Sequence, residues 1–222
     1  VVIAGAYFTF LFNPATTIKT LSAEKTKHYL PDSSEVVLNA FSALSYSANR
    51  WSNERRVSLE GEAFFTVAKG SRFDVETLSG TVTVLGTQFN VKMRKDYFEV
   101  ACYEGLVEVR STGIVAQLTP TRVFRVVKGV PTDQSSTSET APGWLRDESS
   151  FESVPFGEVL EEFERQYNVT ITTRNVDIEK LFTGRFGHSD FQKALQSISI
   201  PLKLTYAVSA DQKIVVLSGE AD

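Results

Sequence analysis

Glu60 and Glu62 are the first residues whose types and spacing suggest chemistry, because paired carboxylates are the catalytic groups of glycosidases. Residues two apart in an extended strand lie on the same face. Glycosidase carboxylates, however, normally come from different elements that line a cleft. Two glutamates at this spacing are therefore interpreted as a solvated strand face, and glycan hydrolysis is left as an alternative.

The sequence His188-Ser189-Asp190 contains the residue types of a hydrolase triad, but consecutive residues cannot converge on one line of proton transfer. Ser189, with Gln192 three residues later, instead predicts a capping box that begins a helix. Neither His28 nor His188 has a second ligand at a metal-binding spacing, so we expect no metal site. We expect no cofactor either, since no glycine-rich loop leads from a strand into a helix.

The single cysteine, Cys102, excludes an internal disulfide. It alternates with Phe98 and Val100, which predicts a buried position on the core face of a strand. No neighbouring basic residue in the sequence would lower the pKa of its thiol. With catalytic, metal and phosphate motifs all unsupported, we predict that the protein is not an enzyme and acts through contact.

An acidic helix between Arg146 and Asn168 is the most suggestive surface. Its excess of carboxylates could steer a basic partner. The candidate partner-binding residues are Glu158, Glu161, Glu162 and Arg165. The alternatives are a solvated helix face, or recognition through an exposed strand edge elsewhere in the same domain.

The composition argues against nucleic acid as a partner. The chain has 23 basic and 27 acidic residues, a net charge of −4, whereas phosphate binding depends on clustered Lys and Arg. With 222 residues the chain can bury a core without disulfides.

Val1–Phe12 is apolar almost without a break, yet a spanning helix needs about 20 such residues. We expect residues 1–16 to be the outer end of a transmembrane helix whose upstream part is missing, or an apolar lead-in. A buried first strand and a signal-peptide remnant are the alternatives.

Residues 17–128 alternate short apolar runs with turn signals every 8 to 12 residues or so, which predicts an all-β domain built as a sandwich or solenoid. In 87–92 the alternation indicates a strand with one face on the core. Residues 129–143 are rich in Ser, Thr and Pro, which is typical of a flexible linker.

Residues 144–222 predict a small α+β domain of order βαββαββ. Its first helix carries an apolar stripe, with Ser153 as the N-cap, Pro155 in the first turn and Asn168 at the end. The stripe comprises Phe156, Val159, Leu160, Phe163 and Tyr167. The protein as a whole is therefore predicted to be mainly β.

Several motifs closely resemble the FecR family. They are Leu30–Ser34, Val37–Ala40, Gly61–Phe65 and Leu85–Val91. The segments Phe163–Val169 and Phe182–Phe186 resemble the C-terminal domain that follows FecR in Bacteroidota proteins. That domain is similar to the short N-terminal domain of secretins and TonB-dependent transducers.

The resemblance implies the periplasmic region of a single-pass inner-membrane anti-sigma regulator, with its membrane helix ending near Phe12. In this family the C-terminal part contacts the signalling domain of a TonB-dependent outer-membrane transducer. A cytoplasmic segment, absent from this sequence, would act on an extracytoplasmic-function (ECF) sigma factor.

The main alternative is an envelope β-domain that binds a carbohydrate or another small molecule directly. It requires a concave aromatic site, and Tyr46, Trp51 and Tyr103 are its candidate residues.

Overall fold

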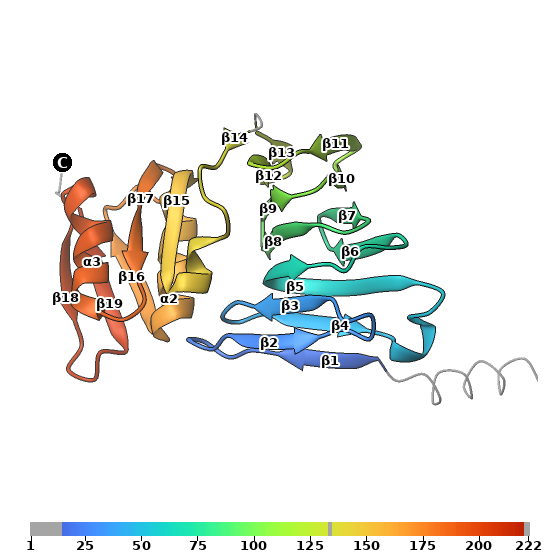
Figure 1. Ribbon diagram of the computed structural model, residues 1–222. Coiled ribbons are helices and arrows are strands. Elements are labelled where there is room, and N and C mark those ends of the chain that lie inside the picture. Colours follow the sequence, from blue (N-terminus) through green and yellow to red (C-terminus); the bar gives the residue numbers. More distant parts are fainter. Residues whose placement is uncertain (1–14, 133–134, 220–222) are drawn as a thin grey trace, which may run out of the picture. The chain divides into compact units, whose positions relative to one another are not determined.

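The structure, a computed structural model, describes residues 15–132 and 135–219 (Figure 1). The described residues divide into two compact units, one of residues 15–20, 25–132 and 135–141 and the other of residues 21–24 and 142–219. The predicted membrane segment Val1–Phe12 lies outside the described residues. Within the described ranges, no helix combines the length and the apolar character needed to cross a membrane.

The first unit consists mainly of short strands that form one many-stranded, curled sheet (Figure 1). The strands are β1 (Thr16–Lys19), β2 (Thr26–Tyr29), β3 (Glu35–Leu38), β4 (Ala43–Tyr46), β5 (Arg55–Thr66), β6 (Phe73–Thr77), β7 (Gly80–Val84), β8 (Gln88–Arg94), β9 (Tyr97–Glu104), β10 (Val107–Ser111), β11 (Ile114–Leu118), β12 (Arg122–Val127), β13 (Val130–Pro131) and β14 (Ser135–Ser136). A 3-10 turn, η1 (Ala48–Arg50), separates β4 from β5.

Strand β5 organises this sheet because its two halves have different neighbours. The first half pairs antiparallel with β4 and parallel with β6, up to Glu60. From Gly61 onward, β5 pairs antiparallel with β8, and from Ala63 onward it also pairs antiparallel with β3. The main path of the sheet is β11-β10-β7-β6-β5-β8-β9-β12-β13. The change of partners occurs at Gly61, whose φ of 96° lies in the left-handed region that favours glycine.

The core of this unit lies on the inner face of the curled sheet. Phe65 stacks on Phe89 with ring centroids 5.0 Å apart and meets Phe73 edge-on. Such aromatic contacts add roughly 0.5–1.5 kcal/mol per pair beyond the burial of area. Cys102 is a buried, free cysteine in the same cluster, which confirms its predicted place in the core.

The described part of the segment predicted as a linker, residues 129–132 and 135–143, contains two short strands. Strands β13 and β14 both pair antiparallel with β12. They satisfy backbone groups that β12 would otherwise expose, which composition alone does not reveal.

The second unit has the predicted order βαββαββ (Figure 1). Its elements are η2 (Gly143–Arg146), β15 (Glu148–Pro155), α2 (Phe156–Tyr167), β16 (Thr170–Arg174), β17 (Leu181–Gly187), α3 (Phe191–Ser199), η3 (Ile200–Leu202), β18 (Thr205–Val208) and β19 (Ile214–Ser218). Strands β15 and β17 form an antiparallel pair, and β16-β19-β18 form a second sheet in which β16 and β19 run parallel. The predicted fold class, mainly β with a small C-terminal α+β region, is therefore confirmed.

Both predicted N-caps are wrong by one or two residues. Ser153 lies in β15 with φ 49°, and α2 begins after Pro155. Asp190, not Ser189, caps α3, because its Oδ1 accepts the backbone N–H of Lys193 at 3.1 Å. Aspartate caps as well as serine does, so residue type could not separate the two positions. Asn168 ends α2 in the left-handed conformation, as expected.

Candidate functional site

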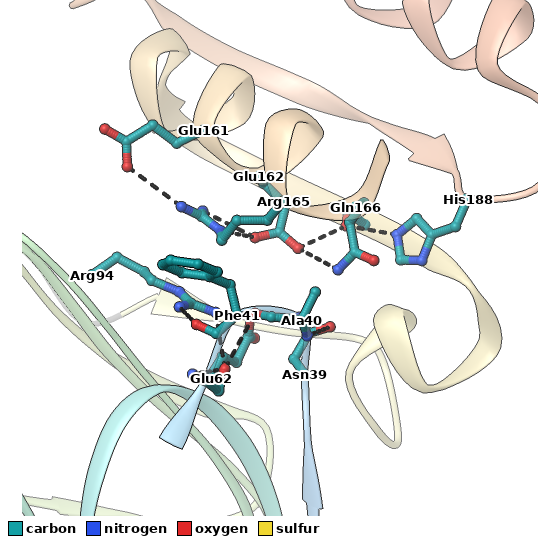
Figure 2. A network of polar contacts seen from close by, with 12 residues as sticks. Asn39, Ala40, Phe41, Glu62, Arg94, Glu161, Glu162, Arg165, Gln166 and His188 are labelled. Atoms are coloured by element: carbon teal, nitrogen blue, oxygen red, sulfur yellow. Dashed lines mark hydrogen bonds and ion pairs between the residues drawn. The ribbon is translucent and has the colours of Figure 1, made fainter. Parts of the chain in front are cut away.

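A polar cluster centred on Glu62 lies in the first unit (Figure 2). The two oxygens of Glu62 accept the side-chain amides of Asn39 and Asn90, each at 2.9 Å. Glu62 is only 5% exposed. A buried carboxylate is tolerated when it accepts several hydrogen bonds, so this arrangement fixes β3, β5 and β8 to one another.

The same cluster holds the turn between β3 and β4. The guanidinium of Arg94 donates to the carbonyl oxygens of Ala40, at 2.8 Å, and Phe41 (Figure 2). A Cβ atom at Gly61 would lie 2.5 Å from the hydroxyl of Ser42 and 2.7 Å from Arg94. Glycine at this position therefore provides both the positive φ and the space that the arginine occupies.

Three of the sequence motifs thus converge in space. Asn39 comes from Val37–Ala40, Glu62 from Gly61–Phe65 and Asn90 from Leu85–Val91. Sequence reasoning assigned these motifs to turn glycines and core aromatics and missed the polar cluster. The signal that could have revealed it is a set of polar residues inside otherwise apolar strands.

The solvated strand face predicted for Glu60 and Glu62 is wrong for Glu62, which is buried, and the glycosidase alternative is wrong as well. The Glu62 carboxylate is engaged by two amides in a buried position, whereas Glu60 is exposed. The two carboxylates therefore do not line a common cleft across which a scissile bond could lie.

The aromatic small-molecule site is also wrong as predicted. Tyr46 and Trp51 are 9% and 5% exposed, and their rings contact each other edge-on inside the core. Tyr103 is half-buried and packs instead against Phe64. The three rings therefore form no exposed, concave surface for a sugar.

The acidic helix α2 carries a second cluster, centred on Glu162 (Figure 2). Glu162 accepts the guanidinium of Arg165 at 3.0 Å and the amide of Gln166 at 2.8 Å, while the Ser149 hydroxyl lies 3.4 Å away. The Glu162 side chain is 3% exposed. This residue, proposed from sequence as a partner contact, thus joins α2 to β15 within its own unit.

The other candidate contacts surround that cluster. Glu161 reaches Arg165 at 3.4 Å and has a side chain 27% exposed, and Glu158 is half-buried in the first turn of α2. The structure thus brings Glu161, Glu162 and Arg165 together and leaves Glu158 a turn away. Their role in binding a partner stays a prediction.

His188 does not form a hydrolase triad with its sequence neighbours. Its Nε2 lies 2.9 Å from the Ser149 hydroxyl, which comes from β15. Asp190 serves as the cap of α3, and the hydrogen bond from the Lys193 N–H holds the pKa of that carboxyl below its usual value. Ser149 is 5% exposed, so a substrate could not reach its hydroxyl.

In the described ranges, no three His, Cys, Asp or Glu side chains gather closely enough to hold a metal ion. Burial raises the pKa of the Cys102 thiol to about 11, so this thiol stays protonated near neutral pH. The expectations of no catalysis and no cofactor remain predictions.

Comparison with known proteins identifies relatives of both units. A family model described as "FecR protein" matches residues 16–108, and one described as "FecR, C-terminal" matches residues 148–216. The search of curated proteins gave no match.

Two crystal structures, each described as "a putative anti-sigma factor from Parabacteroides distasonis ATCC 8503", are similar over nearly the whole chain. The first, at 2.50 Å, has a TM-score of 0.85 and 29% identity, and covers 94% of this chain and 100% of that one. The second, at 1.65 Å, has a TM-score of 0.83 and 28% identity, and covers 93% and 100%.

Proposed function

Because this chain belongs to the FecR family, we propose that it is the periplasmic, signal-receiving part of an anti-sigma regulator. An outer-membrane TonB-dependent transducer contacts it, and an ECF sigma factor is released or activated through a cytoplasmic segment outside this sequence. The observation that carries the proposal is that the two FecR models fall on the two units in order, one on the curled sheet and one on the α+β unit.

The α+β unit receives the contact. This assignment is supported by the acidic surface of α2, where Glu158 and Glu161 remain partly exposed. Glu162 and Arg165 act behind them as positioning residues, because their mutual ion pair holds the helix surface in place. Along the chain, the curled sheet is the spacer between this unit and the predicted membrane segment, which would end near Phe12.

A pull-down followed by a direct binding assay tests the proposal. The 222-residue protein is immobilised and exposed to envelope extract of the source organism, and captured proteins are identified by mass spectrometry. The expected result is a TonB-dependent receptor with an extra N-terminal periplasmic domain, and that purified domain should then bind the chain directly. A purified domain that fails to bind would refute the proposal.

Charge reversal locates the contact. Glu158→Lys with Glu161→Lys should weaken binding of that domain about tenfold or more at low salt, and the loss should shrink as salt rises. The matched control is Glu152→Lys, an exposed carboxylate in β15. Equal affinities for the double variant and the control would show that the transducer domain binds somewhere other than α2.

A further inference from the structure

A groove on the first unit has a volume of about 570 Å³. That volume lies within the range of roughly 300–1,000 Å³ that is typical of small-molecule sites. Four segments line it. They are the turn after β5 (Lys69, Arg72), the end of β7 with the turn that follows it (Thr83, Leu85), the start of β10 with the residue before it (Leu106, Glu108), and Gln117 of β11.

One wall of the groove is apolar. Leu85 and Leu106 are 62% and 50% exposed, although they belong to turns where polar residues would be expected. Single exposed leucines are common on protein surfaces, but two exposed leucines that line one groove form an apolar patch. Such a patch marks a site where a ligand can bury apolar surface.

The other wall presents a fixed guanidinium. The Nε of Arg72 donates to both oxygens of Asp74 at 2.9 Å, and Asp74, 8% exposed in its side chain, also accepts the hydroxyl of Thr83 at 2.6 Å. The side chain of Arg72 is itself 61% exposed and lines the groove, where its Nη2 also donates to the Thr83 hydroxyl at 3.4 Å. A planar guanidinium held in one orientation is suited to a carboxylate or sulfonate.

The charges around the groove leave an excess of one cation. Asp74 is paired with Arg72, and Glu108 is paired with Arg110 at 2.8 Å. Lys69 forms no ion pair in the described part of the chain, and its stem packs so closely on Gly86 that a Cβ there would lie 2.7 Å from its Cγ. The surface is therefore complementary to an anion with an apolar tail.

We propose that this groove binds a small anionic amphiphile, with the acid group on Arg72 and Lys69 and the alkyl chain on Leu85 and Leu106. The proposal does not depend on the transducer contact, since it concerns only the curled sheet. It assigns to the first unit a direct ligand-binding role in addition to that of a spacer.

Calorimetric titration of the full chain with sodium octanoate tests the proposal, with octanol and octyltrimethylammonium as neutral and cationic probes. Octanoate should bind and the other two should not. Hydrogen bonds to charged groups are worth about 1.5–3 kcal/mol, so Arg72→Gln should weaken octanoate binding roughly tenfold or more. Hexanoate should bind up to about 15-fold more weakly, which corresponds to about 0.8 kcal/mol for each buried methylene.

Matched variants separate binding from folding. Lys69→Gln breaks no ion pair in the described structure and should still weaken octanoate binding, as should Leu85→Ser. The controls Lys19→Gln and Leu78→Ser lie outside the groove, Leu78 being 88% exposed, and should bind as the unaltered protein does.

Three results would overturn the proposal. One is the absence of octanoate binding, or equal binding of octyltrimethylammonium. Another is binding of a short acidic, leucine-containing peptide by a protein that fails to bind octanoate, which would assign the groove to a protein segment. The third is a dimer, seen by sedimentation and abolished by Leu85→Ser, which would assign it to a second copy of the chain.

Discussion

Replacing Glu162 with alanine should lower the free energy of unfolding of the α+β unit by about 3 kcal/mol. The change removes an acceptor shared by Arg165, Gln166 and Ser149 and leaves their polar groups without it. Breaking a buried ion pair from one side costs about 3–5 kcal/mol. Glu161 would still reach Arg165, which places the expected loss at the lower end of that range.

The two tryptophans provide the assay, because Trp51 lies in the first unit and Trp144 in the second. In a Trp51→Phe background, the fluorescence of Trp144 reports unfolding of the α+β unit alone. For a domain of about 80 residues, a loss of 3 kcal/mol should lower Tm by roughly 12–24 °C.

Glu161→Ala is the matched control. It removes the same charge from the same helix, but its ion pair with Arg165 is long, at 3.4 Å, and its side chain is 27% exposed, so a loss below about 1 kcal/mol is expected. Equal losses for Glu161→Ala and Glu162→Ala would refute the reasoning. An unchanged Tm for Glu162→Ala with loss of transducer binding would instead return Glu162 to the role of a direct contact.

Three further predictions concern the first unit. Gly61→Ala should destabilise it by about 2–4 kcal/mol, because alanine would face both a positive φ and a close contact with Arg94. Trp51 fluorescence in a Trp144→Phe background measures this loss, and an unchanged midpoint of unfolding would contradict the prediction. The thiol of Cys102 should not react with dithionitrobenzoate at pH 8 until the protein is denatured, since burial raises its pKa to about 11. Rapid reaction of the native protein would show that Cys102 is accessible and not buried. Burial opposes ionisation of Glu99, yet the guanidinium of Arg125 and neighbouring donors lower its pKa below 4.5. Its stabilising effect should therefore be present at pH 7 and fade as the pH falls below about 4.5. Glu99→Gln should flatten this acid dependence of the unfolding free energy, and parallel plots of unfolding free energy against pH for the variant and the unaltered protein would refute the prediction.

Residue pattern alone predicted much of the fold, because side-chain periodicity is local. Alternation with a period of two indicated the strands of the first unit, and the stripe of Phe156, Val159, Leu160 and Phe163 indicated the helix now seen as α2. The burial of Cys102 was predicted from the same alternation, which places it on one strand face with Phe98 and Val100. The helix starts were less accurate, since serine and aspartate compete for the cap and the outcome depends on backbone angles.

The sequence by itself determined the class of the protein, from strand and helix periodicity and from motifs that resemble one family. Only the tertiary structure decided what those motifs do. Asn39 and Asn90 lie 23 and 28 residues from Glu62 and meet it because β3, β5 and β8 pair in one register. In the same way, the rotation of α2 turned Glu162 inward while Glu161 stayed partly exposed. Hydrogen bonds between distant residues depend on strand register and helix packing, which no local pattern encodes.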